Sequence, residues 1–91
     1  MCVVGYRIEC ADLPELSGKY ELEYEDQYRV ENEGANILIK HPMEGMWCVS
    51  NGEFFIAIAG DSAADPVAVK SWKIRLKNKM VLSESVVVQK L

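Results

Sequence analysis

The chain contains one histidine, His41, and this limits the reactions that its side chains could catalyse. A Ser-His-Asp or Cys-His arrangement would have to use that imidazole. His41 stands beside Pro42 in a stretch typical of a turn, where a solvated side chain is the usual state. A carboxylate pair such as Asp61 and Asp65 would also have to converge with His41, and nothing in their spacing requires it. We therefore predict that the protein is not an enzyme and has no catalytic residues.

A zinc site would need His41 together with the three cysteines, Cys2, Cys10 and Cys48. No Cys-x-x-Cys pair and no paired histidines support such a site. The odd number of cysteines favours three reduced thiols, at least one of them buried, over one bridge such as Cys2–Cys10 with a thiol left over.

The loop at residues 60–66 contains two carboxylates, which is fewer oxygen ligands than calcium usually takes. We expect these carboxylates to cap backbone amides of their own loop. The chain also lacks a glycine-rich phosphate loop. The sequence therefore predicts no metal and no cofactor.

The chain has 91 residues and a formal net charge of −4. That length fits a single domain, residues 1–91. The negative charge argues against a nucleic-acid partner, because such partners select basic surfaces. No apolar run reaches the roughly 20 residues that cross a bilayer, and residues 1–10 lack the pattern of a signal peptide.

Short segments of alternating polar and apolar residues, separated by turn signals, recur along the chain and predict strands. The alternation is clearest at residues 19–25 and 67–77, while residues 80–89 read as a last strand or a pair of strands. No segment shows a helical period beyond one short turn near residues 13–16. We predict an all-β fold, a compact antiparallel β-sandwich or small barrel of seven to eight short strands.

Asn51-Gly52 lies between two runs rich in β-branched and aromatic residues, 46–50 and 53–59. Asn-Gly suits a type I′ turn, which predicts a β-hairpin with a two-residue loop. In that register Ser50 faces Glu53, Val49 faces Phe54, Cys48 faces Phe55 and Trp47 faces Ile56. The alternation then places the following residues on one core face: Trp47, Val49, Phe54, Ile56 and Ile58. Phe55, Ala57 and Ala59 make the other face apolar, as in a strand covered on both sides or one that meets a partner.

Two stripes of like charge follow from the same alternation. They are ordinary solvated faces, or they meet across strands or between two copies of the molecule. Most aromatic side chains fall on inward faces, and Tyr28 and Phe55 are the two that could mark an exposed contact surface. The acidic stripe consists of Glu21, Glu23 and Glu25, and the basic stripe of Lys73, Arg75 and Lys77.

Several turns and core aromatics together span nearly the whole chain: Gly18-Lys19-Tyr20, Trp47 before Asn51-Gly52, residues 63–66, Val69 to Trp72, and the closing segment from Ser83 to Val88. This pattern resembles an uncharacterised small β-sandwich domain from a large DNA virus of marine algae, an Emiliania huxleyi virus. It is also similar to small β modules of protist multidomain proteins. The resemblance implies an all-β fold and a role in recognition or assembly, and it implies no functional residues.

Two functions remain open. The first is a non-enzymatic binding or protein-interaction module, whose partner is another protein or a second copy in a homodimer. It would use an apolar sheet face, a strand edge, or the loops that follow Pro42 and Gly60. The second is a domain that binds a small ligand, a lipid or a carbohydrate, between the sheets or in a barrel mouth. The many large side chains argue against a roomy interior.

Overall fold

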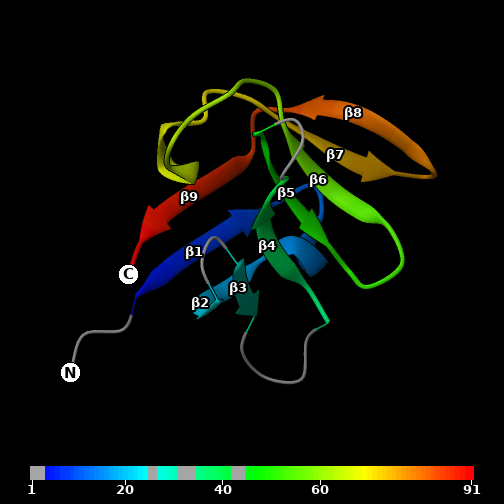
Figure 1. Ribbon diagram of the computed structural model, residues 1–91. Helices are drawn as coiled ribbons and strands as arrows, with labels where there is room; N and C mark the ends of the chain where they lie inside the picture. The colour runs from blue at the N-terminus through cyan, green and yellow to red at the C-terminus, as the bar shows by residue number, and fades with distance from the viewer. Residues whose placement is uncertain (1–3, 25–26, 31–34, 42–44) are drawn as a thin grey trace.

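The computed structural model describes residues 4–24, 27–30, 35–41 and 45–91, and in these ranges nine strands form one antiparallel sheet (Figure 1). Strands that follow one another in sequence pair side by side from β1 to β8, and β9 returns to pair with β1. The strands are β1 (Gly5–Cys10), β2 (Gly18–Tyr24), β3 (Gln27–Val30), β4 (Ile37–Lys40), β5 (Trp47–Ser50), β6 (Phe55–Ala59), β7 (Trp72–Leu76), β8 (Lys79–Ser83) and β9 (Val86–Lys90).

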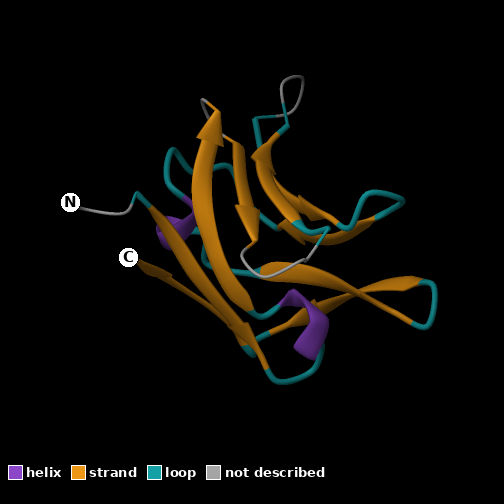
Figure 2. Ribbon diagram, turned by 90° about the horizontal axis from the view of Figure 1, so that it is seen from below, coloured by secondary structure: helices purple, strands orange, loops and turns teal. Residues whose placement is uncertain are grey.

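The sheet curls until it is nearly closed into a barrel, which confirms the predicted all-β antiparallel fold in its barrel form (Figures 1 and 2). β8 and β9 are consecutive along the chain, and a bend after Ser83 separates them. In the bent segment that these two strands form, β8 pairs with β7 and β9 pairs with β1. The bent segment thereby joins the two sides of the barrel, in agreement with the predicted strand or pair of strands at residues 80–89.

Large side chains from β1 to β7 fill the interior of the barrel. Tyr6 meets Tyr28 edge to face with ring centroids 5.0 Å apart, and Tyr28 lies 6.1 Å from the ring of Trp47. Trp72 and Ile74 complete this core from β7, at 3% and 0% exposure. Burial of these apolar surfaces is the main force that stabilises the fold.

A short 3-10 helix, η1 (Pro14–Leu16), connects β1 to β2 and places the fully buried Leu16 in the core. The Tyr20 hydroxyl donates to the Leu16 carbonyl at 2.7 Å, and Asn36 Nδ2 donates to that hydroxyl at 3.2 Å. Burial raises the pKa of Tyr20 to about 12, and the hydrogen bond from Asn36 partly offsets this shift. These contacts fix the helical turn on one end of the barrel.

The segment between β6 and β7 lies at the other end, since alternate connections of an antiparallel meander lie at opposite ends. It contains the second short helix, η2 (Pro66–Ala68) (Figure 2). The indole of Trp47 donates to the carbonyl oxygen of Ala63 at 3.1 Å, and the Tyr6 hydroxyl donates to Asp65 at 3.2 Å. Core aromatics therefore hold this segment by their polar atoms while their rings pack inside.

The predicted type I′ turn at Asn51-Gly52 is wrong, and so is the register that it implied. The loop runs over four residues, 51–54, and Asn51 does not adopt a positive φ. Instead, its side-chain Oδ1 accepts hydrogen bonds from the amides of Glu53 and Phe54, at 2.9 and 2.8 Å. An asparagine side chain that bonds to nearby amides stabilises a different turn from the one its dipeptide favours.

The observed register pairs Val49 with Ala57 and Ser50 with Phe55, so Ile56 has no partner on β5. This bulge lets Ile56 and Ala57 both enter the core, at 2% and 0% exposure. The predicted core face is therefore only partly right. Trp47, Val49 and Ile56 are buried, whereas Phe54 is 47% exposed and Ile58 is half-buried on the outer side.

A two-residue turn does occur, between β7 and β8. It consists of Lys77 and Asn78, with φ of 49° and 65°. Positive φ at both positions is the type I′ geometry that suits the twist of a hairpin. The turn therefore continues β7 directly into β8.

The two charged stripes do not meet within one molecule, since β2 and β7 are separated in the sheet by four other strands. Glu23 pairs instead with Arg29 on β3, which lowers the pKa of the Glu23 carboxyl. Glu25 lies outside the described residues. Cys10 and Cys48 are buried and form no disulfide among the described residues, as predicted for at least one buried thiol, and Cys2 also lies outside the described residues.

Candidate interaction surface

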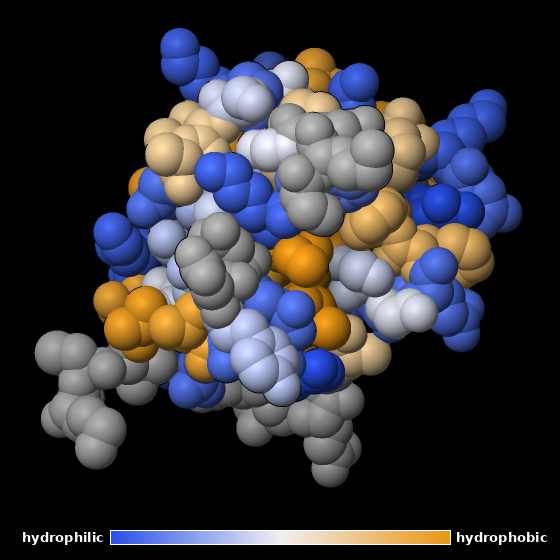
Figure 3. Space-filling view, in the orientation of Figure 1, coloured by the Kyte–Doolittle hydropathy of each residue, from blue (hydrophilic) through white to orange (hydrophobic). Residues whose placement is uncertain are grey.

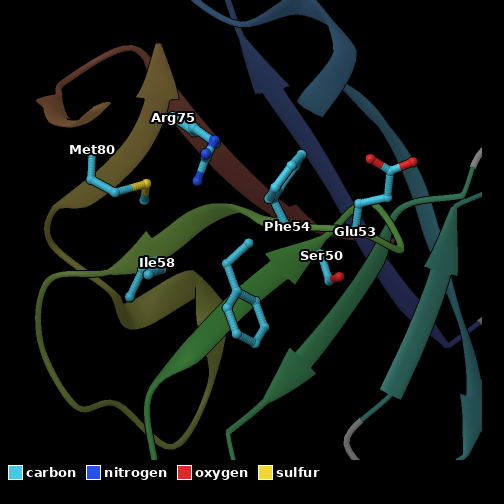
Figure 4. Close-up of a pocket in the computed structure, with 7 residues that line it drawn as sticks. Ser50, Glu53, Phe54, Ile58, Arg75 and Met80 are labelled. Carbon is cyan, nitrogen blue, oxygen red and sulfur yellow. The ribbon is translucent and has the colours of Figure 1, made fainter. Parts of the chain in front are cut away.

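A hollow of about 430 Å³ opens on the outer side of the barrel, over β5 to β8 (Figure 4). Phe55 and Ile58 come from β6, Met80 from β8 and Arg75 from β7, and Phe54 comes from the loop before β6. Ser50 and Glu53 complete the lining. In Figure 3, apolar side chains gather over β4 to β6 and continue toward the β7–β8 hairpin. The hollow is thus an apolar depression with few charged groups.

The two phenylalanines form the exposed apolar part of this hollow, at 47% exposure for Phe54 and 42% for Phe55. The guanidinium carbon of Arg75 lies 4.3 Å from the centroid of the Phe54 ring, a cation–π contact that holds this ring against β7. The His41 ring meets Phe55 at 6.2 Å. Phe55 is exposed as predicted, whereas Tyr28, the other candidate, is buried at 8% exposure and belongs to the core.

The β7–β8 hairpin beside the hollow, together with the segment just before it, is strongly basic. Residues 66–83 contain five cations, Lys70, Lys73, Arg75, Lys77 and Lys79, and no Asp or Glu. The rest of the chain carries a net charge of −9, since the whole chain carries −4 and this segment +5. None of the five forms an ion pair with any residue that the structure describes. The outer surface therefore combines exposed aromatic rings with cations available to a partner.

A cluster of polar side chains lies at the bend between β8 and β9. The hydroxyls of Ser83 and Ser85 both donate to Asp12 Oδ2, at 3.2 and 2.9 Å. The Cys10 thiol and the Ser83 hydroxyl lie 3.4 and 2.9 Å from the Ser85 hydroxyl. These bonds tie the bend to the segment that follows β1. We infer that the cluster stabilises the nearly closed barrel by holding the β8–β9 bend against the segment after β1.

The carboxylates of the loop at residues 60–66 serve its backbone, as predicted. Asp65 Oδ1 accepts from the Val67 amide at 2.9 Å and caps η2, and Asp61 Oδ1 accepts from the Lys70 amide at 3.1 Å. Within the described ranges, His, Cys, Asp and Glu side chains form no group of three that could hold a metal ion. No helix in these ranges is long and apolar enough to span a membrane.

Asp65 also links this loop to the first and last strands, β1 and β9. Its carboxylate accepts a hydrogen bond from the Tyr6 hydroxyl and lies 3.4 Å from Lys90 Nζ. Partial burial alone would raise the pKa of Asp65, but hydrogen bonds from Val67 and Tyr6 and the charge of Lys90 outweigh it and lower the pKa below its ordinary value. Burial, together with the Asp65 charge, raises the pKa of Tyr6. The network therefore favours an ionised Asp65 carboxylate beside a neutral Tyr6 hydroxyl.

We expect the stability from Asp65 to depend on pH. Because folding lowers the pKa of this carboxyl, its contribution is full above the ordinary value of 3.8 and disappears as the pH falls through the lower folded value. The variant Asp65→Asn should be less stable than the parent at pH 7, and the difference in urea unfolding should shrink as the pH falls below 3.8. A stability difference that stays constant from pH 7 to pH 2.5 would contradict this prediction.

The described part of the chain thus defines an all-β domain, a nearly closed antiparallel barrel with a filled interior and an apolar, partly basic outer surface. Comparison with protein-family models, with curated proteins and with solved structures finds no match for this chain. The resemblance to the algal-virus domain accordingly stays a prediction.

The sequence predicted Phe55 as an exposed side chain and Arg75 as part of the basic stripe, and it missed Phe54 and Met80. Phe54 was placed in the core by the register of the supposed two-residue turn. Two adjacent phenylalanines carried a usable signal, because in a regular strand one of two neighbours must face outward. No such signal brings Arg75 and Met80 to the same hollow, since their proximity depends on the pairing of β6 with β7 and of β7 with β8.

Proposed function

We propose that this protein is a non-enzymatic protein-interaction module that binds a partner segment on the outer surface of β5 to β8. The observation that carries the proposal is the apolar hollow around Phe54 and Phe55 beside the β7–β8 hairpin, whose cations form no ion pair with any residue that the structure describes. Exposed aromatic residues and arginine are the residue types that contribute most at protein interfaces. The matching partner is a segment with an apolar side chain for the hollow and acidic side chains for the hairpin.

Binding of a lipid or carbohydrate is the alternative function. The interior of a barrel is the usual site for such a ligand, and here it is occupied by Tyr6, Tyr20, Tyr28, Trp47 and Trp72, all at 8% exposure or less. A small ligand would thus be left with an open surface site, such as the outer hollow, where it could bury little of its own surface. This favours a protein partner, which covers a shallow site over a larger area.

The test is selection from a displayed library of random peptides, followed by affinity measurement with the peptides recovered. We expect peptides that combine acidic residues with an aromatic or large aliphatic residue. Phe55→Ala should weaken their binding by about tenfold or more, as for a central interface residue. Arg75→Gln should weaken it less and should flatten its dependence on salt.

Leu22→Ala is the matched control, because Leu22 is exposed to a similar degree, 47%, and lies on β2, away from the hollow. It should bind the selected peptides as the parent does. Selection of no peptides, or equal losses from Leu22→Ala and Phe55→Ala, would contradict the proposal. Binding of a single-stranded oligonucleotide in preference to every peptide would replace the proposed partner class with nucleic acid.

A further inference from the structure

β8 is an edge of the sheet. Among the described strands it pairs with β7 alone, and β9 departs from it at the bend to pair with β1. In Figure 2, β7 and β8 extend away from the rest of the sheet as a two-stranded ribbon. Two apolar side chains of β8 are exposed, Val81 at 37% and Leu82 at 64%. An extended edge with exposed apolar side chains is a template on which another strand can pair.

The turn between β7 and β8 determines which backbone groups of this edge are available. In a hairpin with a two-residue turn, the two residues that flank the turn exchange both of their hydrogen bonds, and every second pair does so after that. The flanking pair is Leu76 and Lys79, and the next such pair is Ile74 and Val81. The amide and carbonyl groups of Met80 and Leu82 must then point away from β7, toward the free edge.

We propose that a second copy of this chain pairs with the free edge of β8, antiparallel and with two-fold symmetry about Val81. In this register Met80 of each copy lies opposite Leu82 of the other, and Val81 lies opposite Val81. Both outward-pointing residues of each copy are then used, which gives four backbone hydrogen bonds between the copies. A two-fold axis at Met80 would instead place Leu82 opposite Asn78 in the turn, and an axis at Leu82 would place Met80 opposite Glu84 in the bend.

The charges of the hairpin favour the same register. Lys79 lies opposite Ser83 of the second copy, and the next residue along that copy is Glu84. Lysines on opposite strands are thus kept apart, whereas like charges directly across a strand pair repel. Lysine on an edge strand commonly prevents unspecific pairing, so Lys77 and Lys79 would also disfavour slipped registers. The edge adjoins the peptide surface proposed above at Met80, which also lines the hollow, but the pairing uses backbone groups of β8 and does not depend on that function.

Crosslinking tests the register directly. In the proposed dimer the two Val81 Cα atoms form a non-hydrogen-bonded pair, about 4.5 Å apart, within the range that a disulfide spans. In a background with Cys2→Ser, Val81→Cys should therefore form a disulfide-linked dimer under mild oxidation. Leu82→Cys is the control, because Leu82 is the more exposed residue but lies more than about 7 Å from its counterpart in this register.

Sedimentation equilibrium tests the edge without any crosslink. Leu82→Pro removes an outward-pointing amide, which leaves the bonds between β7 and β8 in place, and circular dichroism checks that the fold is retained. We expect the parent to associate with rising concentration, with little effect of salt, and Leu82→Pro to associate at least about tenfold more weakly. Leu82→Thr, which keeps the amide, should retain more of the association. A parent that stays monomeric at all concentrations, or crosslinking through Leu82→Cys that equals or exceeds that through Val81→Cys, would overturn the proposal.

Discussion

Replacement of Trp47 by alanine should lower the free energy of unfolding by about 3–5 kcal/mol. Trp47 is 2% exposed, packs against Tyr28, and donates its indole N–H to Ala63 in the segment between β6 and β7. The substitution leaves a large void in the core and removes the donor that holds this segment. A domain of this size has a total stability of about 5–15 kcal/mol, so the variant should lie close to unfolding. Urea or thermal unfolding measures the loss.

Trp47→Phe separates the two contributions. Phenylalanine keeps an aromatic ring in the core but cannot donate to Ala63, so we expect a smaller loss of stability together with faster hydrogen exchange at residues 60–66. A loss below about 1 kcal/mol for Trp47→Ala would mean that the interior is loosely packed. That result would favour the alternative function, because a loose barrel could take up a small ligand.

Replacement of Gly5 by alanine should be at least as damaging as most core substitutions, although it adds only one methyl group. Gly5 pairs with Glu21 across β1 and β2, and a Cβ atom at this position would overlap the carbonyl oxygen of Tyr20. Because the obstructing atom belongs to the backbone, a side-chain rotation cannot relieve the clash. We expect a loss of at least about 2–3 kcal/mol, since the two strands must separate locally.

Gly45→Ala is the matched control for Gly5→Ala. A Cβ atom at Gly45 would meet nothing within 4 Å, and its φ of +67° is the one source of strain. A non-glycine residue in that conformation costs about 1 kcal/mol. Equal losses for the two variants, measured by the same unfolding method, would mean that β1 and β2 do not approach as closely as the structure shows.

The fold was largely predictable because alternation along a strand is a local property. The alternation at residues 19–25 and 67–77 predicted two strands, and the structure places β2 (Gly18–Tyr24) and β7 (Trp72–Leu76) there, with inward residues that include Tyr20, Trp72 and Ile74. The first part of the second segment was predicted wrongly, because Pro66–Ala68 form η2 instead of a strand. The segment at residues 80–89 was also identified as a strand or a pair, and the structure divides it at Ser83. Local pattern could not show that one continuous sheet curls on itself, because closure depends on the pairing of β9 with the distant β1.

The hollow around Phe54 and Phe55 was less predictable, because a single turn determines which side chains line it. Asn51 uses its side chain to bond two amides, which lengthens the loop and shifts the register of β6 against β5. The bulge at Ile56 then turns Phe54 and Phe55 outward together with Ile58. A two-residue turn at Asn51-Gly52 would have hidden Phe54 and left a smaller apolar surface. The sequence favoured that turn, and the competing side-chain hydrogen bonds decided the outcome.

The most direct test of the proposed interaction surface is a nuclear magnetic resonance titration of the isotope-labelled protein with the tightest peptide recovered by display. We expect the amide shifts to change most at Phe54, Phe55, Ile58, Arg75 and Met80, with little change at the core residues Tyr28 and Trp47. Changes centred on the core, or on the distant start of β1 and end of β9, would show that the partner binds elsewhere and would contradict the proposed surface.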